Sequence, residues 1–62
     1  MTRDQAIVKA ARLAAICKRP MGVRKDIFGG FFVDSDSYPK GERVGPNYPL
    51  TAAQSAIANK GA

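Results

Sequence analysis

The sequence predicts a small α+β domain in which an N-terminal helix packs on a three-stranded antiparallel β-meander and a short C-terminal helix follows (αβββα). Two Thr-x-x-Gln segments, at Thr2 and Thr51, mark helix starts. Alternating apolar residues and glycines between them predict a hairpin and a third strand. The 62 residues suffice for one domain with a small core. We expect residues 1–44 to form it, and residues 45–62 to be an irregular, proline-rich segment ending in the short helix.

The first helix is predicted over residues 3–18. Thr2 and Gln5 form a capping box, and Pro20 stops the helix. At 100° per residue, one broad apolar arc faces the sheet and comprises Ile7, Ala10, Ala11, Leu13, Ala14 and Cys17. The opposite arc comprises Gln5, Lys9, Arg12 and Ile16. This placement predicts that Cys17 is a small buried side chain.

Residues 21–34 are predicted to form a β-hairpin. Asp26 and Gly29 fit the first and fourth positions of a type I turn followed by a left-handed glycine. Alternation along the two strands turns four apolar side chains toward the helix: Met21, Val23, Phe31 and Val33. Residues 42–44 are expected to add a short edge strand.

A second helix of about eight residues is predicted after Thr51, where Gln54 completes another capping box. An isolated helix of this length is marginal in water, so it requires docking on the domain or on a partner. The predicted core is thin. A homodimer, or a complex that buries more surface, is therefore an alternative to a free monomer.

Composition excludes several classes of site. The chain has no histidine and one cysteine, which excludes histidine-based acid–base catalysis, a structural zinc site and an internal disulfide. Gly29-Gly30 lacks the Gly-Lys-Ser/Thr ending of a phosphate-binding loop. No apolar run approaches the length of a membrane span, and Lys9 and Arg12 interrupt the pattern of a signal peptide. We expect a cytoplasmic, non-enzymatic protein without a metal or cofactor and without membrane association.

The excess positive charge lies in the first part of the chain. Residues 1–25 carry seven Lys and Arg against one acid, whereas residues 26–62 carry three against four. Such a distribution favours an acidic partner, either a protein surface or a nucleic acid, although a solvated basic face is also ordinary. The candidate nucleic-acid contacts are Lys9, Arg12, Lys18, Arg19, Arg24 and Lys25.

The hairpin tip carries the clearest indication of a protein partner. Ile27 and Phe28 are large apolar residues in a turn, where polar residues are usual. Arg24 and Phe32 are expected on the sheet face that the first helix leaves open. Exposed phenylalanine and arginine are typical of interface hot spots. The predicted partner-binding residues are Arg24, Lys25, Ile27, Phe28 and Phe32.

Intramolecular packing is the alternative for these apolar residues. Phe32 could pack under the C-terminal helix, which would remove it from the open surface. The hairpin tip could be covered by Tyr38, Tyr48 and Leu50, which lie among prolines. Either arrangement would leave less apolar surface for a partner.

Residues 2–34 resemble small uncharacterised accessory proteins of tailed phages and prophages. The pattern comprises Thr2 to Ala6, a helix, the segment from Arg19 to Asp26 and an aromatic return strand. The resemblance implies a small accessory protein of the kind that often binds a host factor or a virion component. Together with the basic charge and the apolar hairpin tip, it leads us to expect a protein that binds a host protein with an acidic surface, in the host cytoplasm, and modulates or inhibits it. A small basic nucleic-acid-binding protein is one alternative. Another is a minor structural virion subunit whose residues 34–50 cover its neighbours.

Overall fold

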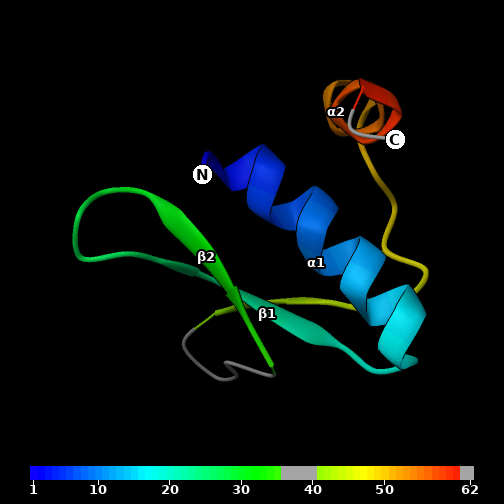
Figure 1. The fold of residues 1–62 in the computed structure, drawn as a ribbon, viewed down its shortest axis with the longest axis horizontal. Coiled ribbons are helices and arrows are strands. Elements are labelled where there is room, and N and C mark those ends of the chain that lie inside the picture. The colour runs from blue at the N-terminus through cyan, green and yellow to red at the C-terminus, as the bar shows by residue number, and fades with distance from the viewer. Residues whose placement is uncertain (36–40, 61–62) are drawn as a thin grey trace.

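The computed structural model describes residues 1–35 and 41–60 (Figure 1). Its elements are, in chain order, α1 (Arg3–Cys17), β1 (Met21–Lys25), β2 (Phe31–Asp34), β3 (Glu42–Val44) and α2 (Ala52–Lys60). The sheet packs against α1, and α2 packs against another side of the same helix. The predicted α+β class, with two helices and a three-stranded antiparallel sheet, is confirmed.

Local hydrogen bonds define both ends of α1. The backbone N–H of Thr2 donates to Gln5 Oε1 at 3.0 Å, and the N–H of Gln5 donates to Thr2 Oγ1 at 3.2 Å. This reciprocal pair satisfies two of the free N–H groups at the helix start, so the predicted capping box is confirmed. At the other end, Lys18 adopts a left-handed conformation with φ 57° and donates its N–H to Ala14.

The hairpin turn between β1 and β2 has the predicted geometry. Gly29 has φ 91°, a backbone conformation that favours glycine, and its N–H donates to Asp26 O at 3.1 Å. The N–H of Asp26 donates to Gly30 O at 2.7 Å, which closes the strands. The Asp26 side chain accepts a longer bond of 3.4 Å from the N–H of Phe28. These bonds fix the direction in which the tip projects.

The predicted meander order is wrong, because β1 lies at the centre of the sheet and β3 pairs with β1 rather than with β2. The free edge of β2 already receives Met1, whose carbonyl accepts a bond of 3.0 Å from Phe31 N–H. Pairing with β1 places Val44 opposite Met21, where Val44 is fully buried.

The core lies between α1 and the sheet. It consists of Ala6, Ile7, Ala10, Ala14, Met21, Val23 and Val44, with Ala11, Leu13, Phe31, Val33, Tyr48 and Leu50 packed around it. The predicted arc of α1 is therefore largely confirmed. Cys17 is an exception, since its thiol is exposed and the prediction of a buried side chain is wrong. Cys17 is the last residue of α1, so no further turn of the helix follows to cover its side chain.

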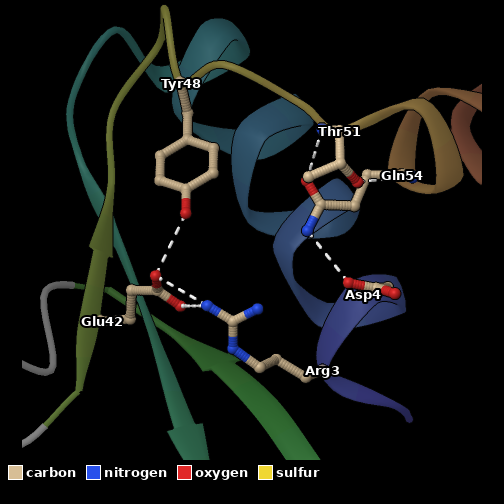
Figure 2. A network of polar contacts seen from close by, with 6 residues as sticks. All are labelled: Arg3, Asp4, Glu42, Tyr48, Thr51 and Gln54. Atoms are coloured by element: carbon tan, nitrogen blue, oxygen red, sulfur yellow. Dashed lines mark hydrogen bonds and ion pairs between the residues drawn. The ribbon is translucent and has the colours of Figure 1, made fainter.

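Helix α2 docks on α1 and contacts none of the three strands. The alternative in which Phe32 packs under the C-terminal helix is therefore wrong. A second capping box starts α2: Thr51 N–H donates to Gln54 Oε1 at 3.0 Å, and Gln54 N–H donates to Thr51 Oγ1 at 3.2 Å. Gln54 Nε2 also donates to Asp4 Oδ1 at 3.0 Å, which joins the starts of the two helices (Figure 2).

A second polar contact ties β3 to the start of α1 (Figure 2). Arg3 Nη2 donates to both carboxylate oxygens of Glu42, at 2.9 and 2.8 Å. The hydroxyl of Tyr48 donates to Glu42 Oε1 at 3.1 Å. Because the ion pair is partly exposed, we expect it to contribute no more than about 1 kcal/mol. It positions the chain that leads from β3 toward α2.

Tyr48 is expected to make stability fall at alkaline pH. Burial raises the pKa of Tyr48 above 10.0, and the hydrogen bond and charge of Glu42 raise this pKa further, while Arg3 opposes the change. The folded protein thus holds the phenolic proton more tightly than the unfolded chain. The resulting stabilisation is complete below pH 10 and is lost as the pH rises through the raised pKa.

Urea denaturation between pH 7 and pH 11 tests this expectation. The unsubstituted protein should lose stability more steeply above pH 10 than Tyr48→Phe, which keeps the ring and lacks the ionisable hydroxyl. Lysine titration is common to both proteins, so the difference between the two curves isolates Tyr48. Parallel curves would show that the hydroxyl is as free to ionise in the folded protein as in the unfolded chain.

Candidate protein-binding surface

The hairpin tip projects two large apolar side chains away from the domain. Ile27 is 91% exposed and Phe28 is 88% exposed. The turn bonds of Asp26 and Gly29 hold the backbone at this point, so the two side chains extend from a defined loop. Single exposed apolar residues are common on protein surfaces, but two adjacent ones at the end of a hairpin form a concentrated apolar feature.

Burial of this tip against another surface would be favourable. Removing a large apolar side chain from water contributes about 1.5–3 kcal/mol to the free energy of binding.

Tyr48 and Leu50, two of the three residues considered as an intramolecular cover, pack instead around the core between α1 and the sheet. Tyr38 lies outside the described residues. Among residues 1–35 and 41–60, the exposed fractions of Ile27 and Phe28 show that both remain open to solvent.

Basic side chains lie directly beside the tip. Arg24 and Lys25 are the last two residues of β1 and immediately precede the turn. Lys25 is exposed, and Arg24 faces away from α1 because it alternates with the buried Val23. The tip thus combines an apolar end with two positive charges at its base.

Phe32 and Arg24 form a pair on the sheet face opposite α1. They are direct cross-strand partners in the β1–β2 register. The Arg24 guanidinium carbon lies 5.6 Å from the centre of the Phe32 ring, within the range of a cation–π contact. Neither helix packs on this face, since α1 covers the other face and α2 contacts α1 alone among the described elements. All five predicted partner-binding residues lie on the hairpin, in β1, in β2 or in the turn that joins them.

The six candidate nucleic-acid contacts are distributed over different parts of the surface. Lys9 and Arg12 lie where α2 meets α1, on the other side of α1 from the sheet. Lys18 caps the C-terminal end of α1. Arg19 donates to Ser35 Oγ at 2.9 Å. Of the six residues, Arg24 and Lys25 lie on the hairpin, at the end of β1. The fold does not align these charges as one stripe.

One surface was missed by the sequence analysis. Val8, which lies outside the predicted apolar arc of the first helix, and Ile57 of α2 both line a groove between the two helices. The available signal was Val8, an apolar residue outside the arc that was predicted to face the sheet. It was not decisive, because the position of α2 depends on contacts between residues far apart in the chain.

The described part of the chain offers no feature of a metal site or a membrane span. Within residues 1–35 and 41–60, no three His, Cys, Asp or Glu side chains gather where they could hold a metal ion. None of the helices there is both long and apolar enough to cross a bilayer. Comparison with known protein families, curated proteins and solved structures finds no match to this chain. Its own surface is therefore the basis for inferring its function.

Proposed function

We propose that this chain is a non-enzymatic accessory protein that binds a host protein with an acidic surface and modulates or inhibits it. The exposure of Ile27 and Phe28 at the end of an ordered hairpin carries the proposal. The resemblance of residues 2–34 to small phage accessory proteins supports a host protein in the bacterial cytoplasm as the partner. The proposal requires no catalytic group on this chain.

The proposed mechanism is occlusion. Phe28, with Ile27 beside it, enters an apolar pocket on the partner, and the hairpin then blocks whatever normally uses that pocket. Large aromatic anchors buried at an interface centre commonly carry most of the binding energy. Arg24 and Lys25 at the base of the tip attract a partner whose pocket has an acidic rim, which raises the association rate at low salt.

Affinity capture from bacterial lysate tests the proposal. The tagged chain is used with and without nuclease, and bound material is washed at rising salt. We expect one stoichiometric protein that survives nuclease and moderate salt and is lost with Phe28→Ala. Ile16→Ala is the matched control, because Ile16 is also exposed (70%) but lies on α1. A partner retained equally by Phe28→Ala would overturn the role of the tip.

Nucleic-acid binding is the second candidate, and the Arg24–Phe32 pair favours it. A basic and an aromatic side chain together on a sheet face that neither helix covers can contact phosphates and stack on bases. In this case affinity for single-stranded oligonucleotides should fall steeply with salt, and Arg24→Gln with Phe32→Ala should weaken binding more than Phe28→Ala does. Capture that disappears with nuclease would make this the better explanation.

A further inference from the structure

The groove between α1 and α2 has the size of a small-ligand site. Its volume is about 340 Å³. Pockets for small molecules typically measure about 300–1,000 Å³, so this groove suits a ligand at the lower end of that range. The groove is lined by Gln5, Val8, Lys9, Arg12, Leu13 and Ile57. It lies on the opposite side of α1 from the sheet and is independent of the hairpin tip.

The lining combines an apolar surface with positive charge. Val8, Leu13 and Ile57 provide aliphatic contacts from both helices. Lys9 and Arg12 supply two cations, and among residues 1–35 and 41–60 the lining includes no Asp or Glu. Lysine and arginine can also add their methylene stems to an apolar surface while their charged ends stay in water. This arrangement complements a ligand with an apolar chain and an anionic end.

Arg12 is positioned by the second helix. Its Nη2 lies 3.5 Å from the carbonyl oxygen of Ala58, near the C-terminal end of α2, where a positive charge is favourable. This long contact uses one of the five N–H donors of the guanidinium. The remaining donors can form a two-point contact with a carboxylate. Lys9, one helical turn before Arg12, is exposed and adds a second charge at the same rim.

We propose that this groove binds a medium-chain aliphatic carboxylic acid. The chain lies on Val8, Leu13 and Ile57, and the carboxylate accepts hydrogen bonds from Arg12 and Lys9. The charge of the rim selects an anion, and the limited volume selects a single aliphatic chain. Because the ligand contacts both helices, its binding also holds α2 against α1.

Titration of the ¹⁵N-labelled full chain with sodium decanoate, followed by two-dimensional NMR below the concentration at which decanoate aggregates, tests the proposal. We expect saturable shifts centred on the groove residues. Each buried methylene contributes about fourfold to affinity, so octanoate should bind about 15-fold more weakly than decanoate. Decanol should bind more weakly than decanoate, and decyltrimethylammonium should leave the groove signals unchanged.

Two variants separate charge from apolar contact. Arg12→Gln should weaken decanoate binding about fivefold, whereas Arg43→Gln, which removes an exposed charge on β3, should leave it unchanged. Ile57→Ala should weaken decanoate and decanol alike. Shifts that do not saturate, that centre on the hairpin tip, or that are the same for decanol and decanoate would overturn the proposal. So would binding of an acidic helical peptide to this groove without any binding of decanoate.

Discussion

Replacing Ile7 by alanine is expected to lower the free energy of unfolding by about 2–5 kcal/mol. Ile7 is fully buried at the centre of the core between α1 and the sheet. The substitution removes buried aliphatic groups and leaves a cavity that a rigid helix and sheet can close only in part. A domain of 62 residues has a stability of roughly 3–9 kcal/mol. The loss is therefore a large part of the total, and the variant is expected to be partly unfolded at 37 °C.

Ile16→Ala is the matched control for this experiment. It makes the same chemical change in the same helix, with the same gain in helix propensity, but Ile16 is 70% exposed. Its stability should lie within about 0.5 kcal/mol of that of the unsubstituted protein. Urea denaturation followed by circular dichroism gives both values. Equal effects of the two substitutions would contradict the packing of α1 on the sheet through Ile7.

Replacing Gln54 by alanine is expected to cost about 1–3 kcal/mol and to release α2 from α1. Gln54 is 3% exposed, and its amide makes two contacts at once. Its oxygen accepts from Thr51 N–H, and its nitrogen donates to Asp4. The substitution removes both contacts and the buried stem. Since a nine-residue helix is marginal in water, loss of docking should let α2 unfold locally.

Gln5→Ala provides the comparison, because Gln5 holds the equivalent position in the first capping box but is exposed. Loss of that box alone should cost about 0.5–1 kcal/mol. Amide hydrogen exchange separates the two variants: Gln54→Ala should remove protection in α2 while α1 and the sheet stay protected. If both variants leave α2 equally protected, the contact between Gln54 and Asp4 does not hold the helices together.

Elements defined by neighbouring residues were predictable from the sequence. Both capping boxes join residues three positions apart, and the hairpin turn depends on Asp26 and on the left-handed Gly29. In each case the donor and acceptor are brought together by the local backbone, so residue types at a fixed spacing are sufficient. The apolar arc of α1 was predictable for the same reason, because helical periodicity determines which side chains share a face.

The candidate partner surface was predictable in its residues but not in its surroundings. Alternation along β1 indicated that Arg24 faces away from the helix, and the turn indicated that Ile27 and Phe28 project from the tip. Whether another segment covers them depends on how residues 45–60 pack. In the structure, Tyr48 and Leu50 join the core and α2 docks on α1, so among the described residues the tip stays exposed.

The sequence by itself determined where the helices and the hairpin form, because those features depend on hydrogen bonds and periodicity within a few residues. Only the tertiary structure decided the strand order, the docking of α2 and the burial of Gln54. These depend on contacts such as Val44 with Met21 and Gln54 with Asp4, whose partners lie far apart in the chain. Several such pairings satisfy the same local pattern, and the preferred one is the arrangement that buries the most apolar surface with its polar groups paired.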